Sequence, residues 1–291
     1  MTFIRRILLL VLSIAFLGAL GVALAPMAPR LADAVAPLVA RAGSEFAPAA
    51  LIATAPMEPR RFTIVERPDL RPLLPRQFSY EPPRLGGVID RETPDRSGPR
   101  PWQLYVPPGI ADDAAPVVVL LHGANRDGRS MIHMWMQLAR SEGAILVALN
   151  APEGGWRVDR LDEAFLDAVL AEVAGVHPID PARLYLFGHS AGSRAAQVLA
   201  NRHPHLWRAV ATHAGTVDPA DLRAVTNGPP VRHYLGTEDH IFDVATATAA
   251  GQRVTALGHD HELVLVPGHT HWFYVGGPIF AADAWAWFES L

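Results

Sequence analysis

The stretch Leu184-Tyr185-Leu186-Phe187-Gly188-His189-Ser190-Ala191-Gly192 decides the fold of this chain. A short apolar run ends at a Gly-x-Ser-x-Gly pentapeptide, and a helix-forming run follows over residues 193–200. A strand, a sharp turn and a helix in that order push a serine hydroxyl out above a sheet. The flanking glycines are expected because side chains there would collide with the neighbouring strand and helix. The pattern predicts Ser190 as a nucleophile, and a glycine-rich turn without chemistry is the alternative.

The rest of the second half alternates short apolar runs with helical segments. Consecutive apolar positions suit strands buried on both faces. The alternation predicts an α/β fold with an open, mostly parallel, doubly wound sheet. Expected strands are 102–106, 117–121, 145–149, 184–187, 209–212, 231–235 and 263–266, and expected helices are 131–142, 162–174, 191–202, 244–257 and 281–290.

The carboxyl ends of such strands are where ligands bind. The first buried strand ends in Leu121-His122-Gly123-Ala124-Asn125. Glycine there lets the backbone approach a substrate closely. The N–H of Ala124, together with that of Ala191, is expected to form an oxyanion hole, although spacing leaves open which N–H of residues 123–125 takes part.

Two later strand ends carry an acid and a base. Residues 236–239, Gly-Thr-Glu-Asp, offer Asp239 as the acid of a Ser…Asp…His triad, with Glu238 as a competitor. Residues 267–272, Pro-Gly-His-Thr-His-Trp, offer His269 and His271 as the general base. Spacing does not separate these two histidines.

Four motifs carry a family resemblance. Leu-His-Gly, Gly-His-Ser-Ala-Gly, Gly-Thr-x-Asp and Gly-His-Thr-x-Trp follow one another over residues 102–291. Together they resemble the α/β-hydrolase fold, and in detail the polyhydroxybutyrate depolymerase-like and feruloyl esterase-like serine esterases. The resemblance implies Ser190 as nucleophile, Asp239 as acid and His269 or His271 as base.

The resemblance also bears on the choice of base. The Gly-Gly-His-Thr-Trp loop of that group favours His269. The Asp-His-Ser-Tyr-Tyr loop of the related S-formylglutathione hydrolases, laid without gaps on residues 270–274, favours His271, which we take as the base. The proline-rich leader and the lack of cysteine are departures from the group.

The first hundred residues have a different character. Arg5 and Arg6 precede an apolar run over residues 7–25, which predicts a signal peptide or a membrane anchor in residues 1–25 and an extracytoplasmic location. Residues 26–100 are rich in proline and are predicted to be a linker, with one strand at 62–66 joining the domain edge. The hydrolase domain is expected over residues 101–291.

Composition narrows the function further. The formal net charge of −4 and the lack of a basic cluster give nucleic-acid binding no support. The absence of cysteine excludes disulfides and thiolate chemistry. Three His-x-His pairs, at 203/205, 259/261 and 269/271, raise the question of zinc, but acidic ligands with consistent spacing are missing. We therefore expect no metal and no cofactor.

The expected function is hydrolysis of carboxylic esters through an acyl-enzyme on Ser190, with a small-molecule or polyester substrate. Trp156 follows a strand end and is a candidate for the pocket wall, although a core or surface role is equally consistent with its position. Two alternatives remain: a membrane-tethered binding protein that kept the fold without the chemistry, and a serine peptidase with the same triad.

Overall fold

The computed structural model describes residues 59–72, 79–110, 114–152 and 155–291, and its compact unit runs from Pro59 to Leu291. The predicted signal or anchor segment at 7–25 and the first half of the predicted linker lie outside these residues. Among the helices within the described part, none has the length and apolar character needed to cross a membrane.

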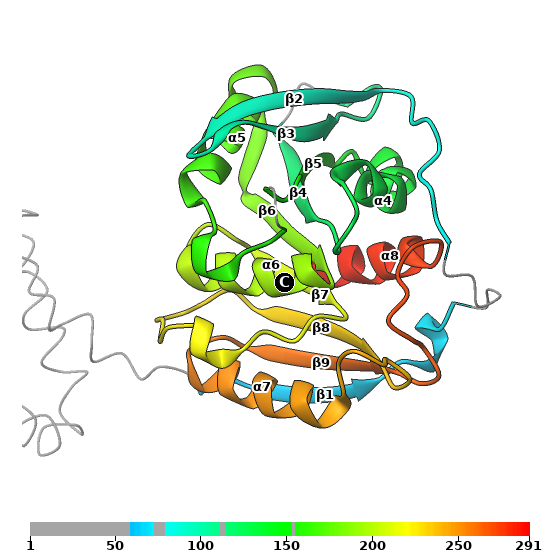
Figure 1. Cartoon of the computed structure of the whole chain (residues 1–291), viewed down its shortest axis with the longest axis vertical. Coiled ribbons are helices and arrows are strands. Elements are labelled where there is room, and N and C mark those ends of the chain that lie inside the picture. The colour runs from blue at the N-terminus through cyan, green and yellow to red at the C-terminus, as the bar shows by residue number, and fades with distance from the viewer. Residues whose placement is uncertain (1–58, 73–78, 111–113, 153–154) are drawn as a thin grey trace, which may run out of the picture. The chain divides into compact units, whose positions relative to one another are not determined.

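Within the described residues one nine-stranded sheet runs through the unit in the order β1-β9-β8-β7-β6-β4-β5-β3-β2 (Figure 1). All neighbouring strands pair in parallel except β3 with β5 and β2 with β3. The predicted, mostly parallel α/β sheet is therefore confirmed. The strands are β1 Phe62–Glu66, β2 Val88–Asp95, β3 Gly98–Tyr105, β4 Ala115–Leu121, β5 Ile145–Leu149, β6 Ile179–His189, β7 Ala209–His213, β8 Val231–Gly236 and β9 His261–Val266.

Helices cover both faces of the sheet. Helices α4 and α8 pack with one set of buried strand residues, whereas α5 and α6 pack with the opposite set and α7 lies against β9 and β1. The described helices are α4 Gly128–Glu142, α5 Glu163–Val176, α6 Ala191–Arg202, α7 Val244–Ala256 and α8 Gly277–Phe288, with short 3-10 turns η3 Pro68–Leu70, η4 Val158–Arg160 and η5 Pro219–Asp221.

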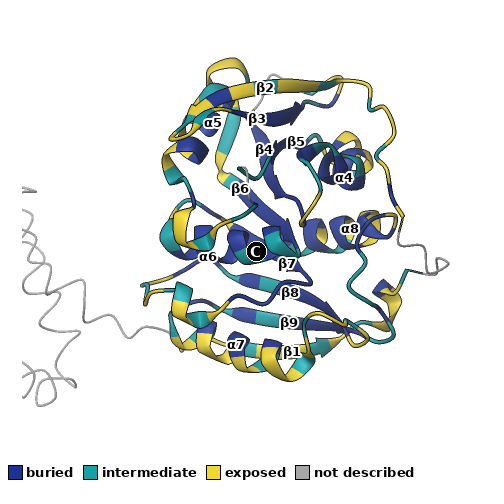
Figure 2. Ribbon diagram, in the orientation of Figure 1, coloured by how far each residue is buried: buried dark blue, intermediate teal, exposed yellow. Residues whose placement is uncertain are grey.

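Strand β4 shows why consecutive apolar residues were needed. Val118 and Leu120 join the core beneath α4 and α8, whereas Val117, Val119 and Leu121 join the core beneath α5 and α6. All five are completely buried. Burying one such side chain contributes about 1.5–3 kcal/mol, so both layers hold this strand in place. Strands β4 and β5 are dark blue in Figure 2, whereas the start of β6 is teal.

Three helices begin at an aspartate whose side chain accepts a backbone N–H three residues later. Asp127 caps α4, Asp162 caps α5 and Asp243 caps α7. Such a cap contributes about 1 kcal/mol. Helix α6 differs, because Ser190 occupies its N-cap position without a side-chain hydrogen bond to the helix. The hydroxyl of Ser190 is thereby left for another partner.

The leader contributes more to the sheet than the predicted boundary at residue 101 allowed. Strand β1, at the predicted position, pairs in parallel with β9, and β2 pairs with β3 at the opposite edge. Strand β2 was not predicted, because five of its eight residues are polar and Pro94 interrupts it. An edge strand tolerates proline, since one of its sides needs no hydrogen-bond partner. Residues 62–66 and 88–100 therefore belong to the sheet, although they fall in the predicted linker.

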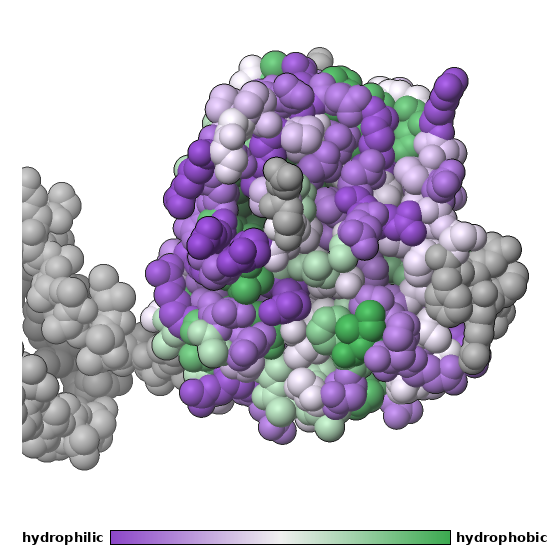
Figure 3. Space-filling view, viewed as in Figure 1, coloured by the Kyte–Doolittle hydropathy of each residue, from purple (hydrophilic) through white to green (hydrophobic). Residues whose placement is uncertain are grey.

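Strand β6 also starts earlier than predicted, at Ile179 instead of Leu184. Residues 180–183, Asp-Pro-Ala-Arg, have the composition of a turn, and only Ala115 of β4 pairs with this early part. The visible surface is mainly hydrophilic, with small apolar patches (Figure 3). The apolar runs of the sequence lie mainly in the two buried layers, one on each face of the sheet.

Candidate active site

The turn at Ser190 is strained and tightly enclosed. Ser190 has φ 53° and ψ −116°, between the end of β6 and the start of α6. Its N–H donates to the carbonyl oxygen of His213 at 2.8 Å. A Cβ on Gly188 would lie 2.3 Å from the carbonyl oxygen of Gly192, and one on Gly192 would lie 2.3 Å from that of Leu121. Only glycine fits at both positions, as the sequence pattern predicted.

The hydroxyl of Ser190 meets a histidine and, through it, an aspartate. Nε2 of His271 lies 2.9 Å from Oγ of Ser190. Nδ1 of the same ring lies 2.9 Å from Oδ2 of Asp239. The three side chains come from the ends of β6, β8 and β9, which are neighbours through β7 in the sheet. The structure thus brings together Ser190, His271 and Asp239 in one row of contacts.

Asp239 is held as an anion. Its other oxygen, Oδ1, accepts the N–H groups of Ile241 and Phe242 at 2.8 and 3.0 Å, and its side chain has no solvent exposure. Burial acts to raise the pKa of Asp239, but the hydrogen bonds from His271, Phe242 and Ile241 outweigh it and lower the pKa below its ordinary value. Glu238, the competing acid, is exposed.

His269, the other candidate base, has a different environment. Its Nε2 lies 2.9 Å from Nε2 of His213, and Nδ1 of His213 lies 3.1 Å from Nδ1 of His189. These three buried histidines form a chain beneath the row of Ser190, His271 and Asp239. Burial lowers the pKa of His269 to about 4 and lowers the pKa of His189 and His213 well below the ordinary value. The structure therefore brings His271, and not His269, to Ser190.

Sequence reasoning missed this histidine chain. In the sequence His189 is only one position of the pentapeptide, and none of the four motifs contains His213. The available signal was position, because His213 is the last residue of β7 and so stands at the same sheet edge as Ser190 and Asp239. The pairing of His189 with His213 across β6 and β7 follows from the register of those strands.

Ala191 follows Ser190 directly, and Ala124 lies on the loop that approaches Ser190. Ala191 is the first residue of α6, where a backbone N–H has no carbonyl of its own helix to bind. Ala124 lies on the exposed loop after β4, next to Asn125, whose φ of 57° turns the chain. This loop approaches the serine closely, since a Cβ on Gly123 would lie 3.4 Å from Cβ of Ser190. Both N–H groups are thus at the serine end of the sheet.

Trp156 is tied to the same loop. Its Nε1–H donates to the carbonyl oxygen of His122 at 2.8 Å, and its ring lies 5.3 Å from that of His122. Cζ of Arg100 lies 5.4 Å from the centre of the indole ring. The nitrogens of His122 are both used, because Nδ1 contacts the carbonyl of Gly123 and Nε2 accepts the N–H of Ala151. Trp156 therefore supports the backbone beside Ala124.

The three His-x-His pairs do not converge. His203 contacts Glu163, His259 contacts Asn201 and the carbonyl of Pro229, and the two histidines of the last pair face different partners. Across the described ranges, no group of three or more histidine, aspartate or glutamate side chains is arranged to hold a metal ion.

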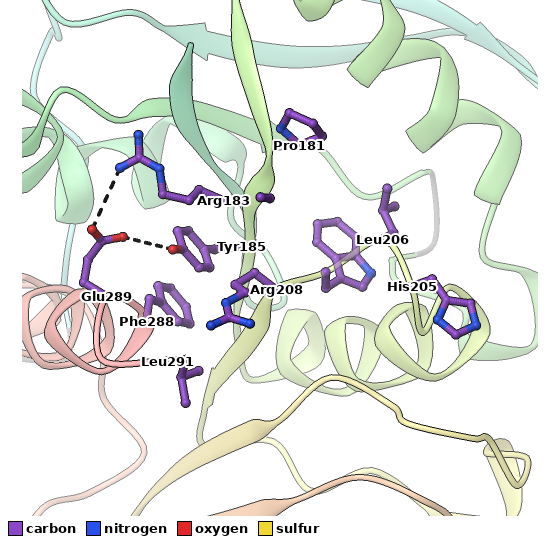
Figure 4. Close-up of a pocket in the computed structure, with 11 residues that line it drawn as sticks. Pro181, Arg183, Tyr185, His205, Leu206, Arg208, Phe288, Glu289 and Leu291 are labelled. Atoms are coloured by element: carbon purple, nitrogen blue, oxygen red, sulfur yellow. Dashed lines mark hydrogen bonds and ion pairs between the residues drawn. The ribbon is translucent and has the colours of Figure 1, made fainter. Parts of the chain in front are cut away.

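A surface pocket of about 570 Å³ lies away from this site (Figure 4). Its walls come from the start of β6, from residues 205–208 before β7 and from the end of α8. These are the amino ends of β6 and β7, whereas Ser190 follows the carboxyl end of β6. Arg183 and Tyr185 in this pocket are bound to Glu289. None of the candidate site residues lines it.

Comparison with known proteins agrees with the fold. A model of the dienelactone hydrolase family matches residues 152–290. This range holds the candidate nucleophile, acid and base. The chain has the α/β-hydrolase fold and resembles its esterases.

Three relatives illustrate the resemblance. NocK of Nocardia uniformis subsp. tsuyamanensis, named as a candidate esterase, is 28% identical over 55% of this chain and 51% of its own length. An S-formylglutathione hydrolase from Agrobacterium tumefaciens matches with a TM-score of 0.58 and 16% identity, over 70% of this chain and 94% of its own. LpqC, a poly(3-hydroxybutyrate) depolymerase from Bordetella parapertussis, matches with a TM-score of 0.55 and 23% identity, over 70% and 91%. The chain spans about half the length of the curated relatives it matches.

The buried histidines predict a pH-dependent stability. Burial lowers the pKa of each of seven buried histidines, so the folded protein keeps them neutral. The unfolded chain, in contrast, protonates them below about pH 6.5. The free energy of unfolding should therefore fall as the pH drops from about 6.5 towards 4. His233, with its pKa lowered to about 4, contributes about 3 kcal/mol of this loss at pH 4. The set is His122, His189, His213, His233, His259, His261 and His269.

Thermal unfolding followed by circular dichroism at pH 8, 6.5, 5.5 and 4.5 measures this loss. His233→Leu removes one buried proton-binding group and should make the decline in Tm shallower. His205→Gln changes an exposed histidine and should leave the decline as in the wild type. A Tm that stays constant between pH 8 and 4.5 would contradict the argument.

Proposed function

We propose that this protein is a serine esterase that cleaves carboxylic esters through an acyl-enzyme on Ser190. One observation carries the proposal: His271 lies 2.9 Å from the Ser190 hydroxyl and 2.9 Å from the Asp239 carboxylate. A base in hydrogen-bond reach of the nucleophile, itself oriented by an acid, is the arrangement that nucleophilic catalysis requires. The resemblance to esterases adds support from outside the site.

The first half-reaction begins at the serine. Oγ of Ser190 attacks the ester carbonyl carbon as its proton passes to Nε2 of His271. The N–H groups of Ala124 and Ala191 stabilise the negative oxygen of the tetrahedral intermediate. The intermediate collapses when His271 returns the proton to the leaving alkoxide, which departs as an alcohol. The acyl group stays on Ser190.

The second half-reaction repeats these steps with water. His271 takes a proton from water, whose oxygen attacks the acyl carbon, and the proton then returns to Oγ of Ser190 as the carboxylic acid is released. Throughout, Asp239 keeps Nδ1 of His271 protonated and stabilises the imidazolium that forms twice per turnover. The low pKa of Asp239 keeps this carboxyl group ionised for that role.

A substrate panel tests the proposal. The purified protein should hydrolyse p-nitrophenyl acetate and butyrate and aryl esters of short hydroxy acids, and Ser190→Ala should give only the background rate of the buffer. p-Nitroanilides of the same acyl groups separate an esterase from a peptidase. Turnover of the anilides beside the esters would assign a peptidase. Failure of every substrate, with no fluorophosphonate labelling at Ser190, would favour a non-catalytic binding protein.

A further inference from the structure

The guanidinium of Arg126 is enclosed by three aromatic rings. Its Cζ lies 5.0 Å from the ring centre of Tyr274, 5.5 Å from that of Tyr80 and 5.8 Å from that of Trp272. A cation at such distances is attracted by the ring faces. We call Arg126 and these three rings the arginine box.

The members of the box come from three segments that meet at the candidate site. Arg126 follows Ala124 by two residues on the loop after β4. Trp272 and Tyr274 lie on the loop that carries His271. Tyr80 belongs to the leader, ahead of β2. The box thus joins the loop of the proposed oxyanion N–H to the loop of the proposed base.

Further contacts fix the rings. Tyr80 and Tyr274 stack with ring centres 4.8 Å apart and an interplanar angle of 14°. The hydroxyl of Tyr80 is hydrogen-bonded to Nδ1 of His133 on α4 at 2.6 Å, and Nη1 of Arg126 donates to the carbonyl oxygen of Tyr80. The box is therefore attached to a helix of the core, and Arg126 is held by both charge and a directed hydrogen bond.

Tyr274 connects the box to the turn beside Ala124. Its side chain is buried, and burial raises its pKa, while the Ser130 hydroxyl and the backbone of Gly123 act against that rise. The hydroxyl is thus neutral and lies next to Gly123. The ring of Tyr274 also meets the ring of His189 edge-on, with centres 5.4 Å apart. One tyrosine therefore touches the segments on both sides of Ser190.

We propose that Arg126 is a positioning residue that holds the N–H of Ala124 in place for the oxyanion. The inference rests on the proposed esterase function. Ala124 and Asn125 are exposed and Asn125 has a positive φ, so this part of the loop has few contacts of its own. A displaced oxyanion donor lowers transition-state stabilisation, whereas ground-state binding of the ester depends little on it. Loss of Arg126 should therefore lower kcat more than it changes KM.

Three variants separate this role from others. Arg126→Met keeps an unbranched apolar stem but loses the charge, and its kcat should fall about 10- to 100-fold with KM within about threefold of the wild type. Arg126→Lys keeps a cation among the rings and should recover part of the loss. Arg129→Gln is the matched control, because Arg129 lies three residues on and pairs with Asp90 outside the box. Its kcat should match the wild type.

Two readouts do not depend on turnover of a particular ester. The second-order rate of fluorophosphonate labelling at Ser190 should fall in Arg126→Met by the same factor as kcat/KM, with Tm nearly unchanged. In Arg126→Ala, ethylguanidinium chloride at tens of millimolar should restore part of the rate, because the cation can occupy the box, whereas equal sodium chloride should not.

The outcomes are distinct. A wild-type labelling rate and kcat in Arg126→Met would reject the positioning role alone. A rise in KM at constant kcat would also reject it and make Arg126 a substrate contact instead. Wild-type protein that neither labels at Ser190 nor turns over any ester would reject the esterase function, and the positioning role with it.

Discussion

Ser190→Ala should reduce turnover of p-nitrophenyl esters at least about a thousandfold while the protein stays folded. The loss follows from chemistry, because alanine offers no oxygen to form the acyl-enzyme. The fold should survive because the side chain of Ser190 makes no hydrogen bond to α6, and the hydrogen bond from its backbone N–H to the carbonyl of His213 does not involve the side chain. The prediction is tested by measuring the ester hydrolysis rates and the thermal unfolding curves of the wild type and of Ser190→Ala.

A fluorophosphonate gives the independent control for Ser190. It should label the wild type at one serine, identified by peptide mass spectrometry, and should leave Ser190→Ala unlabelled. Ser193→Ala is the matched control variant. Ser193 lies one turn into α6, and its hydroxyl donates a hydrogen bond to the carbonyl oxygen of Gly215. Labelling at Ser193, or full activity in Ser190→Ala, would remove the proposed nucleophile.

His271→Ala should be nearly as inactive as Ser190→Ala, whereas His269→Ala should keep about a tenth or more of the activity. The difference follows from the contacts, because only the ring of His271 reaches both Ser190 and Asp239, and the ring of His269 contacts His213. His269→Ala should affect stability more, since it opens a space in the buried histidine chain.

The two variants, His271→Ala and His269→Ala, are compared by measuring both kcat and Tm. His269→Gln, which keeps a side-chain group able to hydrogen-bond His213, should recover part of the Tm lost in His269→Ala. An inactive His269→Ala with an active His271→Ala would transfer the role of base to His269. Asp239→Asn should lie close to His271→Ala, because an amide no longer fixes the tautomer of the ring.

The central strands could be predicted from the sequence, because they are buried on both faces and therefore consist of uninterrupted apolar runs. Gly188 and Gly192 predicted the turn correctly. The structure gives the reason, because a Cβ at either position would lie 2.3 Å from a backbone carbonyl oxygen. Chain order placed Asp239 at the right strand end. Spacing alone left His269 and His271 open, since two residues on one loop differ only in which way their rings point.

The features that escaped prediction depend on contacts between distant segments. Strand β2 has no apolar pattern of its own, because it lies at the sheet edge. The chain of contacts from His189 through His213 to His269 joins the ends of β6 and β7 to the loop after β9. Arg126 and Tyr80 are ordinary residues in sequence, and only the folded chain brings them together. Local patterns predict elements, but the support of a site is tertiary.

The pairing of β1 with β9 has a consequence for how the molecule forms. Phe62 stands against His261, so the first strand of the unit to be synthesised finds its partner only after β9 has left the ribosome. The entropy cost of closing a loop rises only slowly with its length, so the long separation costs little stability. Pairing between residues so far apart in the sequence does, however, slow folding. Until β1 pairs with it, β9 presents an open edge of apolar residues, Leu263–Val266, which can pair with other chains. The strand that precedes the loop of His271 therefore has an edge that is open to aggregation while the domain is being made.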